Sequence, residues 1–206
     1  MSQPCTLLLR LEGPMQSWGF RSRFDYRDTA LEPTRSGVLG LICAAMGIAR
    51  GEGISQFEAI RMGVRVDKQG RPERDYHTAL EVIKADGSGR DAVVSYRDYL
   101  ADASFTVGLQ SENKDLLEEI AKCLRNPAWF LFLGRKAFPL AIPPLQPDDS
   151  PKLGTLEEHL FSGESAKRVV LEADDGERTQ HDWPLCFRQR RFKPRSIHAT
   201  SAGGMP

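Results

Sequence analysis

The stretch Pro33–Leu41 reads PTRSGVLGL and predicts the start of the helix around which the chain alternates between strands and helices. Pro33 cannot donate a backbone hydrogen bond and biases the residue before it toward an extended conformation. Thr34 or Ser36 can cap the helix that follows. Apolar residues then recur at helical spacing, so we expect a helix over 35–47.

The first turn of this helix has the features of an anion-binding site. A helix N-terminus presents unpaired N–H groups and a partial positive charge, and Arg35 adds a planar fork of donors. Gly37 and Gly40 lack the side chains that would keep a ligand away from the backbone. These features suit a phosphate. On these residues alone, an ordinary capped helix whose glycines serve close packing is the commoner explanation.

The patterns on either side of this helix predict an α+β fold. We expect further helices at 55–62 and 113–125, and strands at Thr6–Glu12, Val64–Asp67, Ala103–Leu109 and Trp129–Leu133. With a hairpin insert set aside, the order is βαββαβ, the ferredoxin-like (RRM-like) arrangement. That fold fixes no function, and the strand at 103–109 lacks the aromatic signature of a standard RNA-recognition motif.

We expect the chain to fold as two parts. Residues 1–140 would form the ferredoxin-like domain, with a projecting β-hairpin inserted at about 67–97, and long protruding hairpins are usually functional. Residues 141–206 would form a small β-rich C-terminal extension. Its expected features are a capping box at 155–158, strands at 168–172 and 186–192, and a disordered tail over 199–206.

Charge and composition limit the functions that the chain could have. The 206 residues carry 28 Lys and Arg and 28 Asp and Glu, and this balance argues against a generic nucleic-acid binder. However, several basic residues cluster within Arg188–Arg195, after an acidic stretch.

No apolar run approaches the roughly 18 residues of a membrane span and no signal peptide is evident, so we expect a cytoplasmic protein. The four cysteines are far apart, no Walker loop is present, and no paired carboxylates lie in the apolar, turn-flanked context of a metal nuclease. We therefore expect no metal and no cofactor.

Five separated motifs resemble one known family. In chain order they are GPMQSWG at 13–19, PTRSGVLGL at 33–41, DYHT at 75–78, YLADASFTV at 99–107 and LGRK at 133–136. Together they resemble the CasD family of type I-E CRISPR Cascade subunits, which belongs to the RAMP superfamily of CRISPR-associated RNA binders. The resemblance covers about residues 5–140 and is loose in the C-terminal third.

The resemblance implies a non-catalytic subunit of an antiviral ribonucleoprotein complex. Such a subunit holds the 5′ handle of the CRISPR RNA (crRNA) and caps the filament of CasC backbone subunits. The hairpin would be a thumb that packs against the neighbouring CasC and helps kink the RNA. The CasA subunit, which reads the PAM of the target, would dock nearby, so target DNA would be met only through the assembled complex.

The implied RNA contacts extend over several segments. The helix start would seat a handle phosphate, with Arg35 pairing to it, and the loop at 133–136 would contact RNA although it is less glycine-rich than the corresponding family loop. Arg23 lies in a segment of interleaved basic and aromatic residues, and the last two candidates rest on charge density alone. The predicted RNA-binding residues are Gln16, Trp18, Arg23, Thr34, Arg35, Ser36, Gly37, Tyr76, His77, Tyr96, Arg97, Arg135, Lys136, Arg190 and Arg191.

Two other functions remain open. Some RAMP relatives cut repeat RNA without a metal by activating a 2′-hydroxyl, and His77 with Tyr76 and Lys84 would be the candidates here. A lone strand histidine is more often structural, and in type I-E systems the CasE subunit is the processing enzyme, so we expect no catalytic residues. A general interaction module without RNA would leave the arginine clusters as solvated surface.

Overall fold

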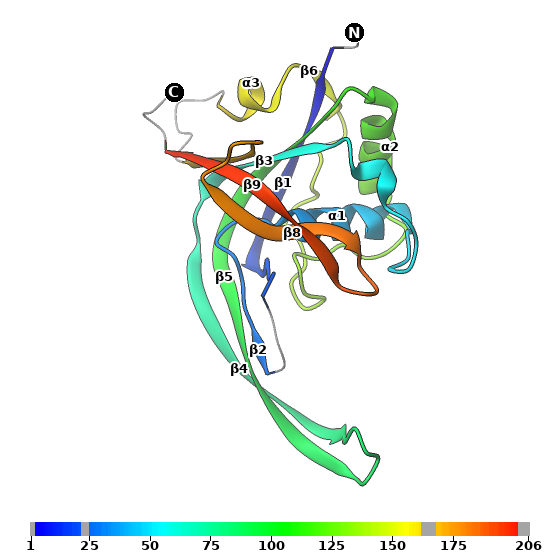
Figure 1. Cartoon of the computed structure of the whole chain (residues 1–206), viewed down its shortest axis with the longest axis vertical. Coiled ribbons are helices and arrows are strands. Elements are labelled where there is room, and N and C mark those ends of the chain that lie inside the picture. The colour runs from blue at the N-terminus through cyan, green and yellow to red at the C-terminus, as the bar shows by residue number, and fades with distance from the viewer. Residues whose placement is uncertain (1–2, 22–24, 162–167, 202–206) are drawn as a thin grey trace.

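The computed structural model describes residues 3–21, 25–161 and 168–201 and shows a mixed α/β fold built on one large, mainly antiparallel sheet (Figure 1). The sheet order is β6-β1-β5-β3-β7-β9-β8, and β2 and β4 also pair with β5. The elements are β1 (Cys5–Gln16), β2 (Tyr26–Arg27), α1 (Arg35–Met46), the short 3₁₀ helix η1 (Ser55–Phe57), β3 (Arg61–Lys68), β4 (Arg71–Ile83), β5 (Arg90–Ser111), α2 (Lys114–Arg125), β6 (Lys152–Leu153), α3 (Leu156–Leu160), β7 (Arg168–Glu172), β8 (Arg178–Cys186) and β9 (Arg191–Ser201).

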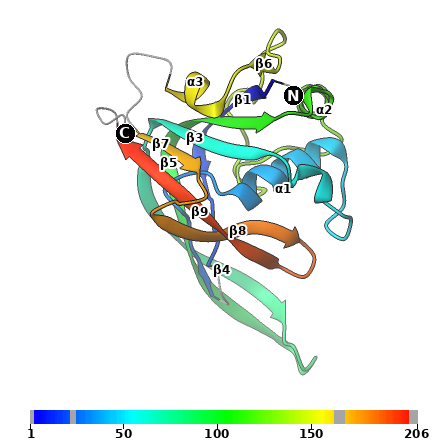
Figure 2. The ribbon, with the colours of Figure 1, turned by 45° about the horizontal axis from the view of Figure 1, so that its top comes forward.

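The main core lies between the sheet and helices α1 and α2. Leu7, Leu9 and Leu11 alternate along β1 on the buried face, because successive strand side chains point to opposite sides. They belong to one cluster with apolar residues of both helices. Leu8 points the other way and packs with a second, smaller cluster that includes Leu156 of α3. Helix α3 therefore covers the opposite face of the sheet (Figure 2).

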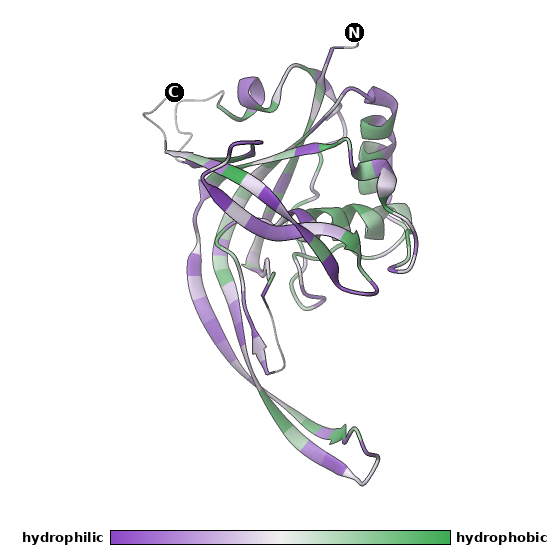
Figure 3. Cartoon of the chain, in the orientation of Figure 1, coloured by the Kyte–Doolittle hydropathy of each residue, from purple (hydrophilic) through white to green (hydrophobic). Residues whose placement is uncertain are grey.

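Strand β5 belongs both to the main sheet and to a long projecting hairpin. Its residues 100–111 pair with β1 and its residues 104–110 pair with β3, whereas residues 90–101 pair with β4. We call residues 71–101 the hairpin arm; it extends far from the remainder of the chain (Figure 1). The hairpin predicted at about 67–97 is therefore present with slightly shifted bounds. Apolar residues gather toward its far end (Figure 3).

The strand predicted at Trp129–Leu133 is not formed. The segment is irregular and contributes only an isolated bridge between Phe132 and Pro139. The sheet edge beside β1 is instead occupied by the two-residue strand β6. The complete ferredoxin-like arrangement is therefore not confirmed. The helix predicted at 55–62 is also shorter than expected, because β3 already begins at Arg61.

The C-terminal strands continue the main sheet through pairing of β7 with β3. The strand expected at 168–172 is confirmed, but the one expected at 186–192 is wrong, because a turn at 187–190 joins β8 to β9. Residues 199–201, expected in a disordered tail, pair with β7, and 202–206 lie outside the described residues. The division at residue 140 stays a prediction. None of the helices in the described ranges is long and apolar enough to cross a membrane.

Candidate nucleic-acid interface

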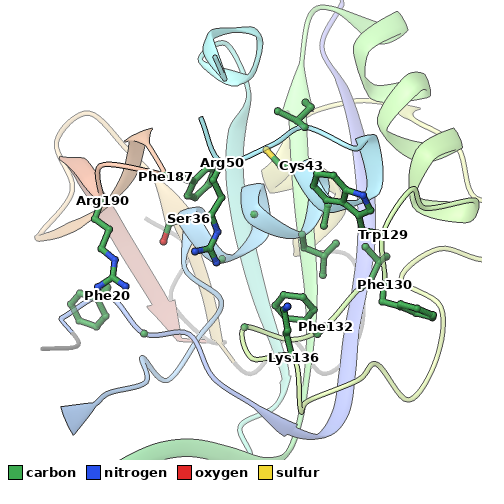
Figure 4. Close-up of a pocket in the computed structure, with 18 of the residues that line it drawn as sticks. Phe20, Ser36, Cys43, Arg50, Trp129, Phe130, Phe132, Lys136, Phe187 and Arg190 are labelled. Atoms are coloured by element: carbon green, nitrogen blue, oxygen red, sulfur yellow. The ribbon is translucent and has the colours of Figure 1, made fainter. Parts of the chain in front are cut away.

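A groove of about 1150 Å³ lies over the exposed face of helix α1 (Figure 4). Its floor includes Ser36, Gly37 and Gly40 from the first half of the helix. Its walls come from four other segments, namely the loop at 129–139, the β8–β9 turn with its flanking residues, the segment that follows β1, and the segment that follows α1. Segments far apart in the sequence thus meet around one helix.

The groove is electropositive. Arg27, Arg50, Lys136 and Arg190 line it, and the described lining residues include no carboxylate. Within the part of the chain that the structure describes, none of these four cations forms an ion pair with Asp or Glu. Although the whole chain is neutral, this surface therefore offers uncompensated positive charge to a polyanion.

Aromatic side chains share the groove with these cations. The lining includes Phe20, Trp129, Phe130, Phe132, Phe187 and Phe192. Phe130 is 95% exposed and Trp129 is 49% exposed, so their rings are available to a ligand (Figure 4). Exposed aromatic rings beside cations are the features with which proteins bind single-stranded nucleic acid, because the rings stack on bases while the cations follow the backbone.

Backbone contacts hold the aromatic wall in place. The Ala128 and Trp129 N–H groups donate to the carbonyls of Ala45 and Ala44 at 2.9 and 3.1 Å, which fixes this segment against the end of α1. Gly134 has φ +85°, and a Cβ there would lie only 1.7 Å from the Ser17 carbonyl oxygen. Position 134 therefore requires glycine, which lets this loop pass close to the backbone of Ser17.

The start of α1 is capped as predicted. The Gly37 N–H donates to the Thr34 hydroxyl at 3.3 Å. A Cβ on Gly37 would lie 2.7 Å from the Trp18 ring, so this glycine serves close packing. Trp18 and Gln16 are buried and joined by a 3.1 Å hydrogen bond from the indole N–H to the amide oxygen. They support the floor from beneath rather than lining it, so their side chains are not open to RNA as the prediction of RNA-binding residues requires.

Arg35 is enclosed in the protein. It is 1% exposed, its Nη1 lies 2.8 Å from Glu172 Oε1, and its Nη2 donates to the Phe57 carbonyl at 3.0 Å. Burial lowers the pKa of Arg35, and the nearby Glu172 carboxylate opposes that effect. This placement contradicts the predicted pairing of the guanidinium with a phosphate. The sequence showed the charge at the helix start but not the internal carboxylate that partners it.

A buried ionic network joins the start of α1 to the C-terminal strands. The backbone N–H of Arg35 donates to Asp182 Oδ2 at 2.7 Å. Arg195 lies 2.7 Å from Asp182 and 3.2 Å from Glu172. Although burial alone would lower the pKa of Arg195, the hydrogen bond and charge of Asp182 leave it raised. The network therefore holds the floor of the groove against β7, β8 and β9.

Some of the other predicted residues lie in the groove and some do not. The groove brings together Ser36, Gly37, Lys136 and Arg190. Arg191 does not line it, and Arg23 lies outside the described residues. Arg135 is tied down at the base of the hairpin arm, where it donates to the Asp98 carbonyl at 2.8 Å. Burial lowers the pKa of Arg135.

The base of the hairpin arm holds the four remaining predicted residues, none of which lines the groove. Tyr76 and Tyr96 pair across the two strands with ring centroids 5.5 Å apart, and Arg97 Nε donates to Ser95 Oγ at 2.9 Å. His77 Nδ1 lies 3.6 Å from Asp75 Oδ2. Whether these residues contact RNA stays a prediction.

The three candidates for a nuclease site, Tyr76, His77 and Lys84, do not come together in the structure. Tyr76 and His77 are neighbours on an extended strand and point to opposite faces. Lys84 follows His77 by seven residues, about 20 Å along a strand, and lies 3.7 Å from Asp91. The described residues also contain no group of three or more His, Cys, Asp or Glu side chains placed to hold a metal ion.

Several lining residues were missed by sequence reasoning. Arg50 has no motif around it, and only the path of the chain after α1 brings it to the groove. The apolar run that contains Trp129, Phe130 and Phe132 predicts a buried strand instead. One sequence signal for the groove residues is the segment of interleaved basic and aromatic residues around Arg23, because Arg27 lies in that segment.

Comparisons with known proteins agree with this architecture. A family model described as CRISPR-associated protein (Cas_Cas5) matches residues 6–200. The chain is 31% identical to the CRISPR system Cascade subunit CasD of Escherichia coli (strain K12), over 96% of both chains. It also resembles a solved chain of a CRISPR RNA-guided surveillance complex, with TM-score 0.80, 32% identity and coverage of 95% of this chain and 89% of that one.

A further solved structure, titled as the crystal structure of a Cas protein, has TM-score 0.74 and 40% identity, and the match covers 95% of this chain and 94% of that one. The resemblance in sequence therefore extends through the C-terminal strands, beyond the five motifs. The chain belongs to the Cas5 family of CRISPR-associated proteins.

Proposed function

We propose that this chain is a non-catalytic RNA-binding subunit of a type I-E Cascade complex that holds the 5′ handle of the crRNA in the groove over α1. The observation that carries the proposal is the groove itself, in which four cations that have no carboxylate partner among the described residues lie beside six aromatic rings. The relative from Escherichia coli is a Cascade subunit, and the similar solved chain belongs to an RNA-guided complex.

The chemistry of the groove favours a single strand. Cations at several points neutralise successive phosphates, and exposed rings accept bases only when those bases are unstacked from a partner strand. The walls lie on both sides of α1, so a strand laid along the groove would contact both kinds of side chain. Contacts of this kind support a protein that holds a single strand in place.

The hairpin arm would cap the CasC filament. Leu80 and Ile83 near its far end are 74% and 69% exposed. Exposed apolar residues concentrated on a projecting element mark a protein contact. In this proposal the arm packs against the neighbouring CasC subunit, CasA docks nearby, and the complex acts in cytoplasmic antiviral defence.

The test measures RNA binding and cleavage together. Purified protein, alone and with CasC and CasA, is titrated with labelled handle RNA in EDTA at several salt concentrations. Changing Arg50, Lys136 and Arg190 to Gln should weaken binding and reduce the salt slope by about 0.7 for each lost phosphate contact. The matched control changes three exposed cations outside the groove, Arg10, Arg71 and Lys114, to Gln.

Unchanged binding by the groove variant in both settings would contradict the proposal. Specific cutting of repeat RNA in EDTA, lost in His77→Ala, would instead support the endoribonuclease.

A further inference from the structure

Neither the backbone conformation nor the packing of the described residues requires a glycine at position 40. It lies in the middle of α1, where glycine destabilises a helix relative to alanine. Its φ is not in the left-handed region, so its conformation suits any residue. A Cβ built on Gly40 meets no heavy atom of the described residues within 4 Å, apart from the adjoining chain and helix backbone.

Two other glycines of the groove differ from Gly40. At Gly37 a Cβ would collide with the Trp18 ring, and at Gly134 both the backbone conformation and the Ser17 carbonyl exclude a side chain. Packing within the fold therefore explains those two glycines. The space above Gly40 is instead part of the groove.

The surroundings of Gly40 indicate what fills that space. The cations and the exposed rings of the walls flank the helix, while the floor at Ser36, Gly40 and Ala44 carries only small side chains or none. These floor residues are four apart and so follow one another along one face of α1. A strand that contacts both walls must cross this floor.

We propose that a nucleotide of the bound RNA packs directly against the backbone of α1 at Gly40, and that the missing side chain sets the clearance of the groove. This inference rests on the proposed RNA-binding function. It makes Gly40 a contact residue that carries no charge and no hydrogen-bonding side chain. Any side chain at this position would occupy the volume that the nucleotide needs.

The test adds side-chain volume without adding charge. Gly40→Ala and Gly40→Gln are compared with Gly53→Gln, because Gly53 also has open space around its Cβ and an ordinary φ but does not line the groove. The full-length variants are studied alone and assembled with the other Cascade subunits. Thermal unfolding checks the fold, and titration with fluorescent single-stranded handle RNA gives the affinity.

We expect Gly40→Gln to unfold at or above the wild-type temperature, since glutamine is the better helix former. Its RNA affinity should fall at least tenfold and that of Gly40→Ala about twofold, whereas Gly53→Gln should bind with the wild-type affinity. If Gly40→Gln unfolds early, a loss of affinity in the folded Gly40→Ala carries the test.

Wild-type affinity in both folded Gly40 variants would overturn the role of Gly40 and leave the RNA-binding function standing. Equal losses in the Gly40→Gln and Gly53→Gln variants would overturn it as well. Failure of the wild-type protein to bind the RNA, alone and in the complex, would overturn both proposals.

Discussion

The guanidinium carbon of Arg35 lies 3.7 Å from the centroid of the Trp183 ring, which joins the first turn of α1 to strand β8. Lys193 Nζ lies 4.4 Å from the same centroid. Cation–π contact adds to the ion pair between Arg35 and Glu172, so the network combines charge, stacking and hydrogen bonding. In the proposed function, this network would act on RNA binding indirectly, through the position of the helix that forms the groove floor.

Replacing Arg35 should unfold the protein more readily. Removing one partner of a buried ion pair costs roughly 3–5 kcal/mol, and we expect about 3 kcal/mol for Arg35→Met because Arg195 still partners Glu172. Urea unfolding measures the change. Arg35→Lys should restore little, since an ammonium lacks the planar fork that reaches both Glu172 and the Phe57 carbonyl. Normal stability together with weakened RNA binding in Arg35→Met would instead support a direct contact between Arg35 and RNA.

Removing the Phe130 ring should affect RNA affinity alone. The side chain is almost fully exposed, so Phe130→Ala should leave the free energy of unfolding within about 0.5 kcal/mol of wild type. Loss of stacking on one base should weaken handle binding by about 1–3 kcal/mol, measured by fluorescence anisotropy. Phe161, which is exposed outside the groove, provides the control variant Phe161→Ala. Equal effects of the two substitutions would argue against stacking at Phe130.

The far end of the hairpin arm should be dispensable for folding but needed for assembly. Leu80→Ser combined with Ile83→Ser removes exposed apolar area, so the unfolding temperature should hardly change. Co-purification with CasC should fall strongly. Leu153→Ser, at an exposed apolar position on β6, is the matched control. Unimpaired assembly of the double variant would show that CasC contacts another surface.

The thiol of Cys43 should react slowly at neutral pH. Burial raises its pKa to about 11, so the reactive thiolate is scarce at pH 7 and increases about tenfold for each unit of pH up to that value. Alkylation followed by mass spectrometry, in a chain with the other three cysteines changed to Ser, measures the rate. Handle RNA should slow it further, because Cys43 lines the groove. A midpoint near 8.5 would show that the thiol is exposed.

The two long helices could be predicted because their signals are local. Thr34 and Asn113 cap them through side chains that accept hydrogen bonds from Gly37 and Leu116, three residues ahead. The hairpin arm could be predicted for the same reason, since its turn and its alternation lie within one stretch.

The segment Trp129–Leu133 could not be assigned from its residues. An apolar aromatic run has the same composition whether it enters a core or lines a groove, and the outcome depends on which sheet edge is free. Here β6, from a later part of the chain, pairs with β1. The role of Arg35 was hidden for a related reason, because Glu172 is 137 positions away in the sequence.

That separation also sets the order in which the protein can mature on the ribosome. Helix α1 is synthesised first, and Glu172 and Asp182 follow Arg35 by 137 and 147 residues, with Arg195 later still. Until then the Arg35 cation has no internal carboxylate and remains hydrated, because burying an unpaired charge is costly. The nascent chain therefore cannot complete the floor of its groove until β7, β8 and β9 have all been synthesised.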